Sequence, residues 1–209
     1  MKRACSKFYH LVKMTNSEQH VTIENNKYRH MKKITVLALL LISLSALAQS
    51  KYLTKAGSLD FEASVPSFEE VAAKNNSVTA ILNTDNGDFA ALALVKAFRF
   101  KNALMEEHFN ENYAESDTYP KATFKGNISG FDISIEDTTK SIDGSLTFHG
   151  VTKEITDISI TIKVVDDKIL LSGNFKVLVS DFDIAIPKIV ANKLSDEVSV
   201  DFNFELAKK

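Results

Sequence analysis

The sequence predicts an all-β domain whose antiparallel strands form a closed barrel or a sandwich of two sheets. Three observations carry this prediction. Apolar and polar residues alternate over many short segments, turn-forming residues separate these segments, and helical periodicity is confined to two short stretches. Because no layer of helices is predicted to cover the sheet, the sheet must bury its own apolar face.

A secretory signal peptide is predicted ahead of this domain, over residues 31–48. A methionine followed by two lysines begins the segment, an uncharged and mostly apolar run follows, and a small-x-small site ends at Ala48. The apolar run is shorter than the ~20 residues that a membrane span requires. A membrane span or a buried helix is therefore the weaker interpretation, and cleavage is expected after Ala48.

Residues 1–30 precede the signal peptide and are polar, with no clear periodicity. A signal peptide begins at the chain start, so Met31 is interpreted as the initiator. Residues 1–30 are then a non-native or unstructured extension, with a genuine extended n-region as the alternative.

The charge of the expected mature domain differs from that of the whole chain. The 209 residues carry a net charge of −2 and one cysteine, Cys5. Residues 49–209 hold 17 basic and 25 acidic residues, which gives a net charge of −8, and no cysteine. This composition excludes a disulfide framework and argues against nucleic acid as a partner.

Each expected strand has one apolar and one polar face, as the last segment shows most clearly with Val198, Val200 and Phe202 alternating with polar residues. Asn86-Gly87 between two apolar runs predicts a hairpin, and Asp166-Asp167 predicts a turn. The expected strands cover residues 59–65, 78–82, 89–95, 121–128, 141–149, 158–164, 171–179 and 198–206.

Two stretches break the alternation and are predicted to be short helices. Residues 68–74 read FEEVAAK, and residues 102–113 place Leu104, Met105, His108 and Phe109 at helical spacing.

The interior of such a domain is either packed or open. Thirteen of the 14 phenylalanines lie in residues 49–209, many of them beside alanine or glycine on the apolar faces. Large rings next to small residues can interlock into a dry core or can line an apolar channel. Composition alone favours the dry core, because most aromatic stripes are core. An eight-stranded barrel has the size for either arrangement.

No catalytic or metal-binding motif is apparent in residues 49–209. His108 has Glu107 and Glu111 near it on one helical face, but zinc would need a third ligand. His149 precedes a glycine and fits a strand-end or turn histidine. The sequence therefore predicts no enzyme, no cofactor and no metal.

Several segments resemble the YceI-like family. Residues 144–153 (GSLTFHGVTK) resemble its signature G-x-L-T-x-H-G-V-T-K, and residues 119–124 (YPKATF) resemble its Y-P-x-x-x-F element. Residues 180–184 (SDFDI) resemble its D-F-G element, although Asp183 stands in place of the usual glycine and the usual arginine is missing. The resemblance extends over about residues 59–206.

The resemblance implies an eight-stranded antiparallel lipocalin-like barrel with one or two short helices, secreted to the periplasm. It also implies that the barrel holds an isoprenoid or another long amphiphile, which favours the open interior. A head group would meet His108, His149 or Asp181 at the barrel mouth. The tail would lie among Phe61, Phe89, Phe98, Phe100, Phe124, Phe148, Phe175, Phe202 and Phe204.

Two other functions remain open at this point. A barrel filled by its own rings would be a structural or interaction module, including a stress-related one, and an enzyme using His108 or a metal is the weakest alternative. A homodimer through exposed barrel faces is compatible with the sequence, although no motif indicates one. No permanent membrane span is expected.

Overall fold

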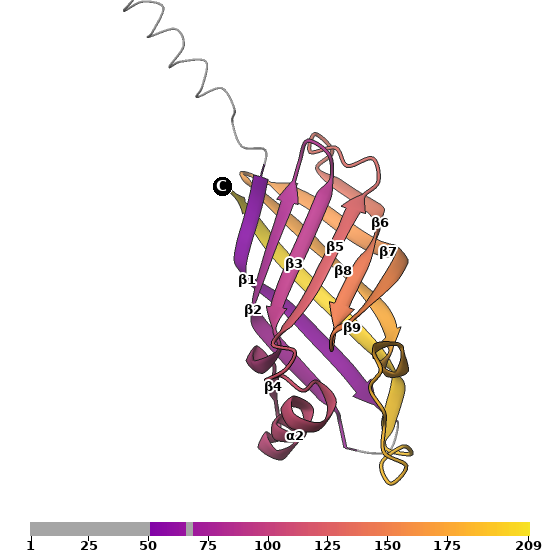
Figure 1. The fold of residues 1–209 in the computed structure, drawn as a ribbon. Coiled ribbons are helices and arrows are strands. Elements are labelled where there is room, and N and C mark those ends of the chain that lie inside the picture. The colour runs from indigo at the N-terminus through magenta and orange to yellow at the C-terminus, as the bar shows by residue number, and fades with distance from the viewer. Residues whose placement is uncertain (1–50, 66–68) are drawn as a thin grey trace, which may run out of the picture. The chain divides into compact units, whose positions relative to one another are not determined.

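A computed structural model describes residues 51–65 and 69–209 (Figure 1). The predicted extension over residues 1–30 and the signal peptide over residues 31–48 lie outside the described residues, so both remain predictions. Within the described ranges, no helix is long and apolar enough to cross a membrane.

Eight long antiparallel strands form a closed barrel, as the alternation and the family resemblance predicted (Figure 1). Their spatial order is β1-β9-β8-β7-β6-β5-β3-β2, and pairing between β1 and β2 closes the ring. A two-residue strand, β4, pairs with β2 at one end of the barrel. The strands are β1 (Lys51–Ser64), β2 (Ala72–Asn83), β3 (Asp88–Leu94), β4 (Arg99–Phe100), β5 (Lys121–Ile128), β6 (Asp137–Phe148), β7 (Val151–Val165), β8 (Lys168–Leu178) and β9 (Leu194–Lys208).

The helical segments are short and lie in the connections between strands. The helix predicted over residues 102–113 is confirmed as α2 (Ala103–His108), which continues into the π-helical turn η2 (Phe109–Tyr113). Two 3₁₀ turns, η1 (Val95–Ala97) and η3 (Val179–Phe182), follow β3 and β8.

The helix predicted over residues 68–74 is wrong where the structure describes it. Ala72 already belongs to β2, and Ala73 pairs with Phe61 of β1 and with Phe100 of β4. Glutamate, alanine and lysine favour helices locally, but pairing with strands on both sides outweighs that weak preference.

Both predicted turns are present, with one difference in detail. Asp166-Asp167 joins β7 to β8, and Asn86-Gly87 lies in the loop between β2 and β3. The loop covers residues 84–87 and only Gly87 has a positive φ, so the connection is longer than a two-residue turn. His149, expected at a strand end or in a turn, forms a two-residue turn with Gly150, and both have positive φ.

One half of the barrel interior is filled by side chains. Phe89, Phe202 and Phe204 lie close together there, with ring centroids of Phe204 5.6 Å from those of the other two. Gly57 provides the space for Phe204, because a Cβ at this position would overlap the Phe204 ring. Aliphatic residues of β6 to β9 complete this packed half, including Ile142, Ile160, Ile162, Ile169, Leu171 and Leu206.

Candidate functional site

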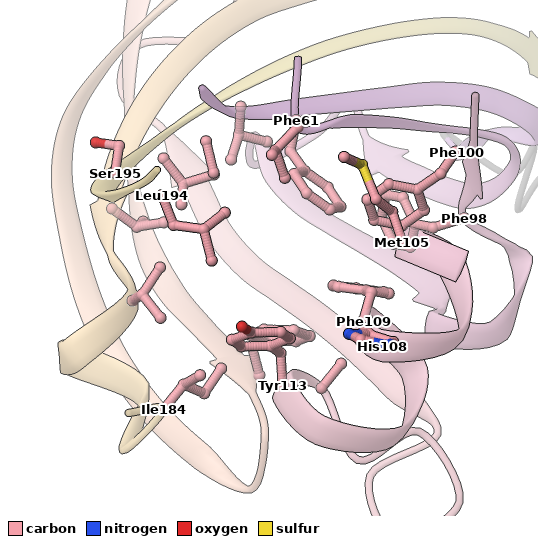
Figure 2. Close-up of a pocket in the computed structure, with 18 of the residues that line it drawn as sticks. Phe61, Phe98, Phe100, Met105, His108, Phe109, Tyr113, Ile184, Leu194 and Ser195 are labelled. Carbon is pink, nitrogen blue, oxygen red and sulfur yellow. The ribbon is translucent and has the colours of Figure 1, made fainter. Parts of the chain in front are cut away.

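The other half of the barrel contains an apolar cavity of about 570 Å³ (Figure 2). Its wall is formed by barrel strands, and two connecting segments cover its end: α2 with η2, and residues 179–193 between β8 and β9. Figure 1 shows both segments at the same end of the barrel.

The strand alternation described above produces the cavity wall. Successive inward positions of β1 contribute Leu59, Phe61 and Ala63, while β8 contributes Phe175 and Val177. The inward row of β9 continues from the cavity into the packed half. The same alternating pattern therefore forms a packed core in one half of the barrel and a cavity wall in the other.

An aromatic cluster attaches α2 and η2 to the barrel. The Phe109 ring lies 5.3 Å from Phe61, 6.0 Å from Phe98 and 5.2 Å from Phe100, measured between ring centroids. These tilted and edge-on arrangements are the ones that aromatic rings prefer. Phe109 consequently serves both as cavity lining and as the anchor of its helical segment.

Polar contacts fix the start of α2. The side chain of Asn102 accepts a hydrogen bond from the backbone N–H of Leu104 at 2.9 Å and caps the helix. Arg99 donates to Glu106 at 2.8 Å, and the other carboxylate oxygen of Glu106 accepts from the N–H of Phe100 at 3.1 Å. These bonds hold α2 against β4.

Two hydrogen bonds join the start of the second cover, residues 179–193, to β9 just beyond its end. The Asp196 carboxylate accepts hydrogen bonds from the N–H of Ser180 at 3.1 Å and from its hydroxyl at 2.9 Å. Beyond Ser180, the buried ring of Phe182 enters the cavity lining, followed by Ile184 and Val190.

The segments that resemble the family signature converge beside the cavity. His149 Nδ1 lies 2.9 Å from the carbonyl oxygen of Phe182, and the His149 ring contacts the edge of Tyr119 at 4.7 Å between centroids. Lys153 lies 3.6 Å from the Asp181 carboxylate. His149 Nε2 is buried without a hydrogen bond, 3.5 Å from a carboxylate oxygen of Glu115. These contacts connect η3 to the loop that follows η2.

The nine phenylalanines predicted to face the interior divide into two groups. Phe61, Phe98, Phe100, Phe148 and Phe175 line the cavity. Phe89, Phe124, Phe202 and Phe204 lie around a void of only about 60 Å³ at the inner end of the cavity, which Phe175 also touches. The four rings therefore form a floor between the cavity and the packed half. The two interiors left open by the sequence thus occur together, one in each half of the barrel.

The three residues predicted to meet a head group lie in different places. His108 lines the cavity, whereas His149 and Asp181 do not: Asp181 belongs to η3, and His149 contacts the η3 backbone at the Phe182 carbonyl. The sequence prediction omitted Phe109, Tyr113, Phe182 and Lys193 from the site. Phe109 was at helical spacing and Phe182 was in a family element, but no pattern indicated that connections would cover the barrel end.

Few polar side chains reach the cavity, and some of them are engaged locally. Glu69 lies 3.4 Å from the amide of Asn102. Nearby, a hydrogen bond to Glu70 raises the pKa of Lys101 and links the chain before β2 to the start of α2. The side chains of His108, Tyr113 and Lys193 form no hydrogen bond or ion pair with another residue in the described ranges. They are the polar groups available to a ligand.

A metal centre is not formed by the residues that the structure describes, since no group of three or more His, Cys, Asp or Glu side chains is arranged around a common point.

Residues 51–206 of this chain match the family model of the YceI-like domain. A search of the curated proteins finds no match.

Solved structures resemble the barrel at low sequence identity. A polyisoprenoid binding domain from Saccharophagus degradans, implicated in plant cell wall breakdown, has a TM-score of 0.66 and 16% identity over 77% of this chain and 99% of that one. BcnA of Burkholderia cenocepacia has a TM-score of 0.60 and 18% identity over 72% and 96%. The YCEI protein of Campylobacter jejuni has a TM-score of 0.56 and 21% identity over 69% and 89%. At these identities the likeness establishes the fold.

Proposed function

Because this chain belongs to the YceI-like family, we propose that it is a binding protein that holds an isoprenoid-like amphiphile inside its barrel. The observation that carries the proposal is the apolar cavity of about 570 Å³, which lies toward one end of the barrel and is floored by phenylalanine rings. Its volume lies within the ~300–1,000 Å³ typical of small-molecule sites.

Burial of the ligand tail would supply the binding energy. Each methylene transferred from water to such a lining contributes about 0.8 kcal/mol. A long hydrocarbon is therefore favoured over a compact polar ligand. The polyisoprenoid binding domain of S. degradans has the same fold, which supports choosing an isoprenoid as the hydrocarbon.

The ligand head group is proposed to lie at the cavity edge near His108, with Tyr113 and Lys193 as additional donors. For His149 and Asp181 we propose an indirect role, in which they hold η3, and thereby Phe182, over the cavity. Binding is proposed to occur without catalysis, so a bound ligand should be recovered chemically unchanged.

Mass spectrometry of an organic-solvent extract tests the proposal. The whole chain is expressed and purified, and part of it is incubated with geranylgeraniol before extraction. We expect a co-purified lipid or stoichiometric uptake of intact geranylgeraniol. A protein that is empty as purified and takes up none would contradict the proposal, and a chemically altered alcohol would contradict binding without catalysis.

A matched pair of variants locates the site. Val200 lines the cavity, whereas Val165 is exposed at the far end of β7. We expect Val200→Trp to lose geranylgeraniol uptake and Val165→Trp to retain it. Equal uptake by both folded variants would place the ligand elsewhere.

For localisation, we propose export to the periplasm after removal of residues 31–48. Sequencing the N-terminus of protein recovered from the periplasmic fraction should give Gln49 as the first residue. Recovery of an uncleaved chain from the cytoplasmic fraction would contradict export.

A further inference from the structure

We propose that the segment of residues 184–193, which covers the cavity, docks on the surface of a phospholipid bilayer. This proposal rests on the proposed function, because docking on a membrane would allow the protein to collect or deliver a water-insoluble amphiphile. The docking itself is measurable without any ligand in the cavity.

The first observation is the exposure of apolar side chains on the two covering segments. Ile189 is 85% exposed, and its neighbour Val190 lines the cavity. On the other cover, Leu104 of α2 is 58% exposed and also lines the cavity. One exposed aliphatic side chain would need no explanation. Here, however, the exposed groups adjoin the cavity on both covers.

The second observation is the charge of the segment. In a domain with a net charge of −8, residues 184–193 contain Lys188 and Lys193 and no acidic residue. Neither lysine forms an ion pair with another residue in the ranges that the structure describes. Lysines flanking an exposed isoleucine match the interface of an anionic bilayer, where the apolar group inserts and the ammonium groups remain at the head groups.

The third observation concerns the backbone of the segment. Two backbone hydrogen bonds lie within it, from Val190 N–H to the Pro187 carbonyl at 2.9 Å and from Lys193 N–H to the Val190 carbonyl at 2.8 Å. The one hydrogen bond in the described chain that joins these residues to a barrel strand runs from the N–H of Leu194, the first residue of β9, to the Val190 carbonyl at 3.1 Å. It is a turn contact and no part of the pairing between strands, so insertion of Ile189 into a bilayer would leave the sheet intact.

The distribution of charge favours residues 184–193 over α2 and η2 as the part that contacts the bilayer. Near Leu104, α2 and η2 carry Glu106, Glu107 and Glu111, of which Glu106 is paired with Arg99. These carboxylates would be repelled by anionic head groups. The lysine-bearing segment therefore leads the contact.

Tryptophan fluorescence provides a direct test, because the chain contains no tryptophan. Ile189→Trp places a single reporter on the segment, and Val165→Trp places a matched one at the opposite end of the barrel. With vesicles of phosphatidylcholine and phosphatidylglycerol, we expect a blue shift and quenching by brominated lipid for Ile189→Trp only. No shift for Ile189→Trp, or equal shifts for both variants, would overturn the proposal.

Loss-of-binding variants supply a second measurement that does not depend on the reporter. In vesicle co-sedimentation, Ile189→Asp should weaken binding at least about tenfold. Lys188→Ala should weaken it about fivefold, and only when phosphatidylglycerol is present. Val165→Asp should bind like the unaltered protein. Unchanged binding for Ile189→Asp would overturn the proposal.

Two further readouts separate the alternatives. Light scattering measures whether the protein forms a dimer, in which a second copy of the chain would cover residues 184–193. A dimer that depends on Ile189, together with no vesicle binding, would overturn bilayer docking. Uptake of geranylgeraniol added without vesicles should be equal in Ile189→Asp and the unaltered protein. Intact uptake without vesicle binding would reject docking alone, whereas lost uptake by the unaltered protein would reject the proposed function.

Discussion

At the scale of single residues, backbone conformation explains an unusual position in the chain. Asp183 ends η3 in the left-handed region, with φ of 56°. Its position corresponds to the glycine of the family element that residues 180–184 resemble. Aspartate tolerates this region better than most residues, but glycine adopts it without a steric cost. The departure from the family therefore preserves the local backbone conformation.

The effect of a substitution at Asp183 on the free energy of unfolding should depend on how well the new residue tolerates a positive φ and not on its charge. We expect Asp183→Gly to leave the free energy of unfolding within about 1 kcal/mol of the unaltered protein. Asp183→Val should lower it by about 1–2 kcal/mol, because a β-branched side chain is strained at positive φ. Urea denaturation measures both, and equal effects of Gly and Val would contradict this account.

A second prediction concerns the space that Gly57 leaves for the Phe204 ring. Alanine at position 57 would push on a ring that is 2% exposed and cannot move into solvent. We expect Gly57→Ala to lower the free energy of unfolding by about 1–3 kcal/mol. The adjacent Ser58→Ala, on the outer face, should change it by less than about 0.5 kcal/mol. A neutral Gly57→Ala variant would show that the packing is looser than described.

At the scale of elements, a β-bulge explains why β2 was harder to predict from the sequence than β9. Strand β9 keeps a strict alternation and was predicted from it. In β2 the pairing with β1 shifts between Val78 and Asn75, so the inward positions on the two sides of the shift are out of phase. A strand interrupted in this way does not show a continuous two-residue period, and its first residues, 72–74, were assigned to a helix.

The bulge also explains a buried polar residue that no motif indicated. Asn75 is fully buried, its amide donates to the Leu94 carbonyl at 3.1 Å, and its oxygen accepts from the N–H of Ser77 at 2.9 Å. The side chain thus satisfies backbone groups that the irregular pairing leaves free. This role depends on the tertiary structure and could not be read from the sequence.

The attachment of α2 and η2 should depend on Phe109 more than on any exposed residue of the same segment. We expect Phe109→Ala to lower the free energy of unfolding by about 2 kcal/mol, because three rings lose their contact with Phe109. Amide hydrogen exchange should increase over residues 103–113 while the barrel strands remain protected. Leu104→Ala, at a largely exposed site, should change little. Uniformly faster exchange over the whole barrel would contradict a local role.

At the scale of the whole molecule, alternation predicted a barrel or a sandwich, the family resemblance selected the barrel, and neither predicted the divided interior. Alternation identifies which side chains of a strand point inward. It does not show whether the inward side chains of opposite strands meet and fill the interior or leave a cavity between them. Phe175 and Phe202 both follow the inward pattern, yet the first lines the cavity and the second lies only at its floor. The difference depends on the glycines and rings opposite them, which belong to strands distant in the sequence.

Removal of a floor ring should change the length of hydrocarbon that the barrel prefers. Phe202 stacks on Phe204 beside the void at the inner end of the cavity. Phe202→Ala would join that void to the cavity, and we expect preference to shift from shorter toward longer isoprenoid alcohols in competition uptake measured by mass spectrometry. Stability should fall by about 3 kcal/mol.

Phe131→Ala is the matched control for this shift, because Phe131 packs against the core without lining the cavity. It should lose stability without a change in preferred length. An unchanged preference in Phe202→Ala would show that the floor does not limit the ligand.

The ring floor also determines what kind of transport the barrel could support. A tube that is blocked part of the way along offers no route from one end to the other, so a guest would have to leave through the opening by which it arrived. The domain could then act as a shuttle that turns toward a donor and later toward an acceptor, but not as a conduit standing between them. Donor and acceptor would compete for the same face of the protein, and delivery would require release from the first before contact with the second.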